Sequence, residues 1–171
     1  PAVSAILNIT PDHLNRHHTM ENYIAAKESI VKNQTRDDLC VLNYNDEVLR
    51  AFGKTLEQKV ILFSSTETLD AGLYLQENEI LWARNGKTEH IISVEELNIL
   101  GAHNYENVMA AVALCDGMGV PMETIREGLR DFHAVEHRIE FVCKKNDIAF
   151  YNDSKGTNPD AAIKGICAMN R

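Results

Sequence analysis

The sequence predicts an α/β fold: a mostly parallel sheet with helices, plus a small antiparallel meander. Over the first 63 residues, short apolar runs alternate with helical stretches, which is the order that builds βαβ units. Residues 72–92 instead hold three apolar runs separated by turn signals, and a strand–strand–helix pattern restarts after His137. We therefore expect one domain over residues 1–136 and the beginning of a second over 137–171.

Three apolar runs in the first part of the chain have the length of buried strands. They are Val3 to Ile9, Leu39 to Asn43 and Val60 to Phe63. Thr19 is placed to cap a helix from Met20 to Lys32, and a further helical stretch covers residues 46–55. The alternation predicts that these strands pair in parallel.

The middle of the chain changes period. Apolar runs at 73–75, 80–83 and 90–92 predict an antiparallel meander, because Asn85-Gly86 is a strong hairpin turn. Helical spacing then predicts a helix over 104–116, with Asn104 at its cap.

The remaining elements follow from turn and cap residues. Gly117 and Gly119 are expected to end the helix before them, and Pro121 opens another that runs to about Phe132. Strands over 139–143 and 148–151 and a helix over 158–169 complete the chain.

Composition excludes several classes of protein. A net charge of −8 over 171 residues argues against a nucleic-acid binder, which normally shows a basic face. There is neither a membrane-length apolar run nor a signal peptide, so we expect no membrane insertion. The four cysteines form no Cys-x-x-Cys pair, which favours reduced, mostly buried thiols in a cytoplasmic protein.

A first polar cluster runs from Asn8 to His17, directly after the first strand. Open α/β sheets bind ligands at the carboxyl ends of their strands. His13 is there either as a metal ligand or as an ordinary turn residue. It has the zinc-protease spacing with His17, but Leu14 occupies the position of the general base, which argues against that activity. Lys27 lies on one helical face with Tyr23 and is either functional or simply solvated.

Two more polar clusters occur downstream. Asn104 is explained as a helix cap, whereas Asn107 in the first turn either reads a nucleobase or phosphate or has no such role. Arg138 suits a nucleotide or an inter-domain salt bridge. Asp153, Lys155 and Thr157 alternate along an extended loop, so one side of that loop presents an acceptor, a cation and a hydroxyl.

Together and in this order, the clusters resemble the signatures of the Mur ligase family, ATP-dependent amide-bond formers of peptidoglycan synthesis. Residues 8–14, followed by Ala25-Ala26-Lys27, resemble the family's metal and carbamylated-lysine region. His103-Asn104-x-x-Asn107 and His137-Arg138-x-Glu140 resemble its nucleotide signatures. The segment 152–158 resembles that of the members that add D-glutamate, and the resemblance covers essentially the whole chain.

The resemblance implies a fold and a reaction. Residues 1–136 would be the later part of the central ATPase domain, and 137–171 the start of a Rossmann-like C-terminal domain. ATP would phosphorylate the carboxylate of UDP-N-acetylmuramoyl-L-alanine, and the amine of D-glutamate would attack the acyl phosphate, with Mg²⁺ as cofactor.

The resemblance also assigns residues to roles. Lys27 and Lys155 would be catalytic, and His13 with carbamylated Lys27 would bind the metal. The nucleotide would be held by Asn104, Asn107, Arg138 and Asp153. The substrates would be held by Ser154, Thr157 and Asn158.

Some family features do not occur in this sequence. They are the Gly-rich phosphate loop, the acidic metal ligand after it and the uridine-binding domain, and Asn15 stands where the family usually has Asp. We therefore expect a piece of a longer ligase, inactive alone and with Lys27 unmodified. The alternatives are a non-catalytic module with a Mur-ligase-like fold, and a metal hydrolase built on His13, His17 and His18.

Overall fold

The computed structural model describes residues 1–133, 135–157 and 159–169, and its main feature is a six-stranded sheet. The strands are β1 (Val3–Ile6), β2 (Leu39–Asn43), β3 (Lys59–Ser64), β4 (Gly72–Gln76), β5 (Glu79–Arg84) and β6 (Lys87–Ser93). They lie side by side in chain order; β1 to β4 pair in parallel and β4 to β6 antiparallel. The predicted parallel sheet and meander are both confirmed.

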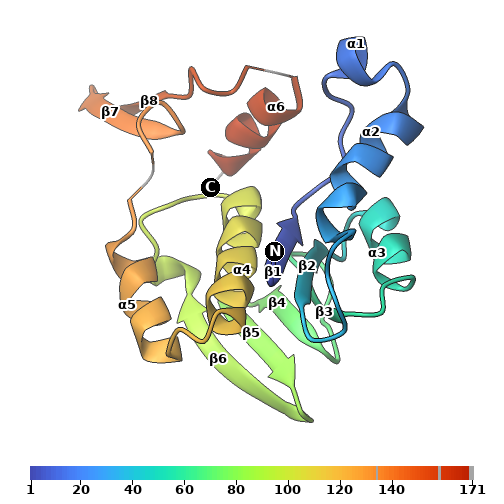
Figure 1. The fold of residues 1–171 in the computed structure, drawn as a ribbon. Coiled ribbons are helices and arrows are strands. Elements are labelled where there is room, and N and C mark those ends of the chain that lie inside the picture. The colour runs from blue at the N-terminus through green and yellow to red at the C-terminus, as the bar shows by residue number, and fades with distance from the viewer. Residues whose placement is uncertain (134, 158, 170–171) are drawn as a thin grey trace.

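Helices lie on both sides of this sheet (Figure 1). They are α1 (Leu14–His17), α2 (Met20–Glu28), α3 (Glu47–Gly53), α4 (Ala102–Gly117) and α5 (Met122–Asp131), with 3₁₀ turns η1 (Ser29–Val31) and η2 (Val94–Glu96). The hairpin of β7 (Glu140–Lys145) and β8 (Ile148–Asn152), followed by α6 (Pro159–Ala168), forms an upper layer above the start of α4 (Figure 1).

Strand β2 shows why the sheet is covered on both faces. All five of its residues are buried, and the side chains of the first four alternate between two hydrophobic clusters. Leu39 and Val41 pack with α4, whereas Cys40 and Leu42 pack with α2 and α3. A strand buried on both faces reads as a continuous apolar run, which is the pattern that predicted it.

Local sequence signals set most element boundaries. The Thr19 side chain accepts a hydrogen bond from the Asn22 backbone N–H, and Asp46 caps α3 in the same way. Asn85 and Gly86 have φ values of 54° and 70°, as the type I′ hairpin turn requires.

Gly117 serves packing rather than helix termination, which corrects the expectation above. It is the last residue of α4, and a Cβ atom there would lie 2.5 Å from Leu39 Cδ2. The absence of a side chain lets the end of α4 approach β2 closely. Gly119, with φ of 80°, provides the left-handed turn that follows.

Other expectations also need correction. β1 ends at Ile6 rather than Ile9, and α2 ends at Glu28 before the chain tightens into a 3₁₀ turn. Two of the four cysteines, Cys143 and Cys167, are exposed rather than buried, since they lie in the upper layer. The expected cap at Asn158 lies outside the described residues.

The upper layer exposes much of its apolar surface. Phe141, Val142, Ile148, Ile163 and Ile166 are each more than half exposed. Because the described part of this layer is an antiparallel hairpin and one helix, its assignment to a Rossmann-like domain stays a prediction.

Candidate functional site

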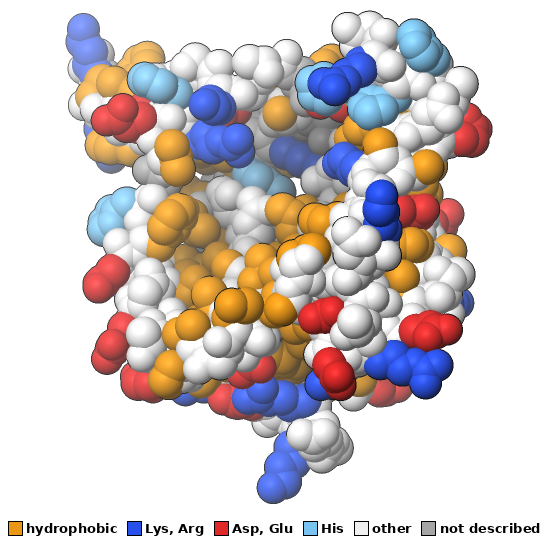
Figure 2. Space-filling view, in the orientation of Figure 1, with side chains coloured by type: hydrophobic (Ala, Val, Ile, Leu, Met, Phe, Trp, Pro, Cys, Tyr) orange, Lys and Arg blue, Asp and Glu red, His pale blue; other side chains and the backbone are white. Residues whose placement is uncertain are grey.

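A polar cleft of about 440 Å³ separates the upper layer from the body of the protein. Figure 2 shows the molecule hollowed there, with Lys and Arg side chains gathered around the hollow. The floor lies at the carboxyl ends of the parallel strands and the start of α4, and the roof is the loop after β8 together with α6 (Figure 1). This is the edge at which open α/β sheets bind ligands.

Most of the predicted site residues line this single cleft. The predicted residues that line it are Lys27, Asn104, Asn107, Arg138, Asp153, Lys155 and Thr157. They come from several segments spread over residues 27–157, so the fold brings the polar clusters together.

Lys27 enters the cleft from α2, where two contacts orient it. Its Nζ donates a hydrogen bond of 3.1 Å to the Asn8 carbonyl and lies 5.0 Å from the centre of the Tyr23 ring. Tyr23 is buried and packs edge-on against His17. The one-face relation of Lys27 and Tyr23 is therefore confirmed, and Lys27 is held rather than freely solvated.

Asn104 and Asn107 project from α4, which begins two residues earlier than expected. Gly101, with φ of 96°, is the N-cap residue, so the prediction that Asn104 caps the helix is wrong. Asn104 Nδ2 instead donates a 2.7 Å hydrogen bond back to the Leu100 carbonyl. Asn107 consequently lies in the second turn of the helix.

The loop that carries Arg138 is tied to the loop after β8. The Ile139 backbone N–H donates to Asp153 Oδ1 at 3.2 Å, and the Lys155 N–H donates to the His137 carbonyl at 3.0 Å. His137 and Ile139 both have positive φ values, which are unfavourable for these residue types, and the two hydrogen bonds stabilise this backbone conformation. Arg138, Asp153 and Lys155 are thereby arranged around one mouth of the cleft.

Two predicted substrate residues are not placed in the cleft. Ser154 is exposed, is not among the lining residues, and its backbone N–H bonds Asn152 Oδ1 at 3.1 Å. Asn158 lies outside the described residues. Of the three, Thr157 is the one that lines the cleft.

His13, the predicted metal ligand, also lies outside the cleft lining. Its side chain is 71% exposed, its φ is 52°, and its Nε2 lies 3.6 Å from Asp12 Oδ2. Asp12 itself does line the cleft, as Lys27 does.

The metal site expected on His13 and carbamylated Lys27 stays a prediction. Among the described residues, no group of three His, Cys, Asp or Glu side chains is arranged to hold a metal. Mg²⁺ usually takes one or two protein ligands and completes its shell with phosphates and water. The alternative of a metal hydrolase needs His13, His17 and His18 to bind one metal ion, and these described residues do not form such a group.

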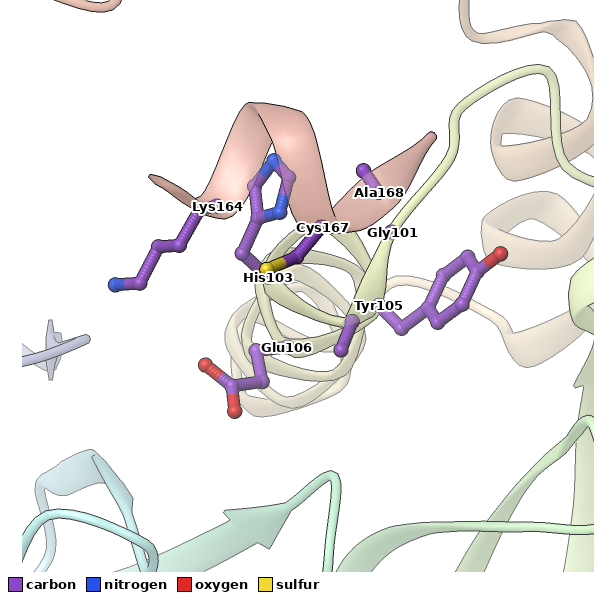
Figure 3. A pocket seen from close by; sticks show the side chains of 8 residues that line it. Gly101, His103, Tyr105, Glu106, Lys164, Cys167 and Ala168 are labelled. Carbon is purple, nitrogen blue, oxygen red and sulfur yellow. The ribbon is translucent and has the colours of Figure 1, made fainter. Parts of the chain in front are cut away.

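A second cavity of about 330 Å³ adjoins the cleft between α4 and α6. In Figure 3, Lys164 and Cys167 of α6 lie across from His103 and Glu106 of α4. Burial, and then the nearby Lys164 ammonium, lowers the pKa of His103. A Cβ at Gly101 would lie 2.7 Å from the Ala168 Cβ, so this glycine permits the close contact between the two helices.

Sequence reasoning missed three residues beside the cleft. Glu106 lines both cavities and accepts hydrogen bonds from Asn43 and Ser65. Asn43 offered a signal, since a buried amide at the end of an apolar strand needs partners. Glu106 and Ser65 offered none.

Comparison with known proteins identifies the fold. The Mur ligase middle domain matches residues 1–115. The chain belongs to the Mur ligase family. Named relatives of this Mur ligase chain include the UDP-N-acetylmuramoylalanine–D-glutamate ligase of Lachnoclostridium phytofermentans, 55% identical over 99% of this chain and 37% of the relative. The protein of the same name from Clostridioides difficile is 47% identical over 100% of this chain and 38% of the relative.

The chain thus spans a little over a third of the length of the curated relatives it matches. Solved structures support the Mur ligase fold. A MurF from Acinetobacter baumannii has a TM-score of 0.71 at 22% identity, covering 96% of this chain and 36% of that one. MurF ligase from Thermotoga maritima in complex with ADP has a TM-score of 0.70 at 20% identity, covering 98% and 39%. No helix in the described ranges is long and apolar enough to cross a membrane.

Proposed function

We propose that this chain is the part of a D-glutamate-adding Mur ligase that forms one wall and the roof of its ATP site. The reaction joins D-glutamate to UDP-N-acetylmuramoyl-L-alanine at the expense of ATP. The observation that carries the proposal is the convergence of Lys27, Asn107, Arg138, Asp153 and Lys155 on one cleft. Similarity over 99% and 100% of this chain to ligases of that name supports the choice of amino acid.

The chemistry sets what these residues must do. A carboxylate oxygen of the first substrate attacks the γ-phosphorus of ATP, and ADP leaves. The D-glutamate amine then attacks the acyl carbon and loses a proton, and inorganic phosphate leaves. Two anions have to approach each other in the first step, so the site needs fixed cations around the transferring phosphoryl group.

The lining residues suit that task. Arg138 presents a planar donor fork for phosphate, and Lys155 is a point charge on the same cleft. Asn104 and Asn107 would hold the nucleotide from α4, and Asp153 would accept from its ribose. Thr157, with Ser154 and Asn158 on the same loop, would face the incoming glutamate.

Magnesium would be held jointly by protein and substrate. His13 and Lys27, the latter as a carbamate, are the proposed protein ligands, and ATP phosphates would complete the shell. The bound ion supplies charge neutralisation at the phosphoryl group. We place the reaction in the cytoplasm, with small-molecule partners and no nucleic acid, in keeping with the net charge of −8.

The test is product formation by the full-length protein that contains this chain. We expect phosphate release that requires ATP, UDP-N-acetylmuramoyl-L-alanine and D-glutamate together, with the amide product seen by mass spectrometry. L-glutamate is the matched substrate control. Lys155→Met should reduce the rate strongly, whereas Lys145→Met, at an exposed lysine of β7 outside the cleft, should not.

The same assay separates the alternative of a non-catalytic module. A full-length protein that binds ADP but forms no amide bond under these conditions would support the module and contradict the ligase. Equal rates with L-glutamate and D-glutamate would leave a ligase but overturn the assignment of its amino acid.

A further inference from the structure

Glu106 of α4 bonds to the carboxyl ends of the parallel strands, beside the cleft. Its Oε1 accepts a hydrogen bond of 2.6 Å from Ser65 Oγ, directly after β3. Its Oε2 accepts one of 3.2 Å from Asn43 Nδ2, the last residue of β2. Asn43 Nδ2 also donates to the Leu7 carbonyl, just past β1, at 3.1 Å. One carboxylate is therefore linked to the ends of three neighbouring strands.

The partners of Glu106 are themselves held in place. Asn43 is 4% exposed, and its Oδ1 accepts from the Asn45 backbone N–H at 2.9 Å. Asn45 Nδ2 donates to Ser65 Oγ at 3.3 Å, and Ser64, fully buried, donates to Asn45 Oδ1 at 2.5 Å. Side chains that each make several hydrogen bonds form a rigid network, and this network holds Glu106 of α4 in place.

The position of Glu106 on the helix connects this network to the cleft. It lies between Asn104 and Asn107, and successive helical residues project about 100° apart. Glu106 bonds to residues at the strand ends, and it lines the same cleft as Asn104 and Asn107. A rotation of the first turns of α4 about its axis would break both carboxylate bonds and move both asparagines.

We propose that Glu106 is a positioning residue: its bonds to Asn43 and Ser65 set the rotation of the start of α4 and hence where Asn104 and Asn107 present their amides. The proposal rests on the proposed function for the role of those asparagines. Glu106 itself contacts no reacting atom in this scheme.

Charge explains why a glutamate suits this place better than a glutamine. Both partners are donors, an amide N–H and a hydroxyl, and a carboxylate is an acceptor at both oxygens. A glutamine would keep one acceptor and turn a donor toward the other partner. If the glutamine oxygen faces Asn43, the Ser65 hydroxyl can rotate to accept from the glutamine amide, so both contacts survive but without the strength that the carboxylate charge gives them.

The experiment uses Glu106→Ala and Glu106→Gln in the full-length protein, with Glu127→Ala as control because Glu127 is an exposed glutamate of α5 outside both cavities. We expect Glu106→Ala to raise the KM for ATP about tenfold to a hundredfold, the loss expected for a hydrogen bond to a charged group. Glu106→Gln should lie between wild type and alanine. The KM values for the other two substrates should not change.

A double variant tests whether the effect travels through the named contact. If Glu106 acts through Ser65, then Ser65→Ala combined with Glu106→Ala should raise the KM for ATP little more than Glu106→Ala alone. Multiplying effects would show that the two residues act independently, which would overturn the proposal.

Amide hydrogen exchange and ADP titration calorimetry separate this proposal from the proposed function. Glu106→Ala should speed exchange over residues 102–107 and weaken ADP binding, and neither measurement needs turnover. If wild type forms no product while both responses occur, the ligase assignment fails and the positioning role stands. Unchanged exchange and ADP affinity would overturn the positioning role whether or not the protein is a ligase. A lower melting temperature with all KM values unchanged would do the same, leaving Glu106 a purely structural residue.

Discussion

The carboxylate of Asp153 accepts a hydrogen bond from the Ile139 backbone N–H at 3.2 Å, which joins the two loops at one mouth of the cleft. These loops flank the β7–β8 hairpin, and each carries a predicted nucleotide residue, Arg138 on the first and Asp153 itself on the second. Asp153 thus holds a loop and is also predicted to face a ligand, and two substitutions can separate these two roles.

Asp153→Asn keeps an acceptor for Ile139 but removes the charge, whereas Asp153→Ala removes both. If loop holding dominates, alanine should weaken ADP binding about tenfold and asparagine only slightly. If the charge toward the ligand dominates, both should weaken it alike. Titration calorimetry on the full-length protein measures this. Asp147→Asn, at the exposed tip of the hairpin, is the control; a comparable loss there would show that the hairpin as a whole, not Asp153, sets the affinity.

Lys27 offers a test of function whose effect on folding can be measured separately. Lys27→Met removes the hydrogen bond to Asn8 and the contact with the Tyr23 ring, which together stabilise the fold by about 1–2 kcal/mol. Ligase activity should fall by more than about a hundredfold, the scale of losing one charged group at a transferring phosphoryl. Lys32→Met, at an exposed lysine beyond η1, should change neither. Full activity in Lys27→Met would show that Lys27 is not a catalytic residue.

Much of the fold could be predicted because its signals are local. β2 is a five-residue apolar run, Thr19 and Asp46 are cap residues, and Asn85-Gly86 is a type I′ turn. Each depends on residues within one turn or one strand, so neighbouring sequence is sufficient. The convergence of Lys27, Asn107 and Lys155 was expected from the family resemblance rather than from spacing.

What could not be predicted depends on contacts that are distant in sequence. Glu106 accepts hydrogen bonds from Asn43 and Ser65, which are 63 and 41 residues away in sequence. Hydrophobic periodicity does not predict contacts of this kind. Asn104 looks like a cap residue, yet its amide turns to Leu100 because Gly101 already starts the helix. His13 lies in a loop whose path depends on Asp12 and on a left-handed backbone angle, so its exposure could not be read from the motif.

Two helical glycines form a matched pair for a stability test. At Gly117 a new Cβ would meet Leu39 Cδ2 at 2.5 Å, whereas at Gly128 of α5 it would meet no atom within 4 Å. Gly128→Ala should raise the free energy of unfolding by about 0.5–1 kcal/mol through helix propensity. Gly117→Ala should lower it by about 1–3 kcal/mol because overpacking outweighs that gain. Urea denaturation gives both values, and stabilisation by both substitutions would show that α4 and β2 separate easily.

The contact between α4 and α6 is expected to weaken as pH falls, because His103 lies between these helices with a lowered pKa. Burial, followed by the nearby Lys164, lowers the pKa of His103, while Asp153 and Glu106 oppose the shift and Arg138 adds to it. The unfolded chain, with a pKa near 6.5, then binds a proton more readily than the folded one. The stability associated with neutral His103 is therefore fully present above about pH 6.5 and is lost as pH falls toward the lowered folded value.

Urea unfolding between pH 7.5 and 5.5 should show this loss in wild type and a smaller one in His103→Asn. His18→Asn is the control, because His18 is exposed and asparagine tolerates its left-handed backbone angle. Carboxylates contribute equally to all three proteins, so the difference between the curves isolates the histidine. The prediction would be contradicted if the free energy of unfolding changed with pH equally in wild type and His103→Asn. Protonation of His103 would then not affect folding or the packing of α6 on α4.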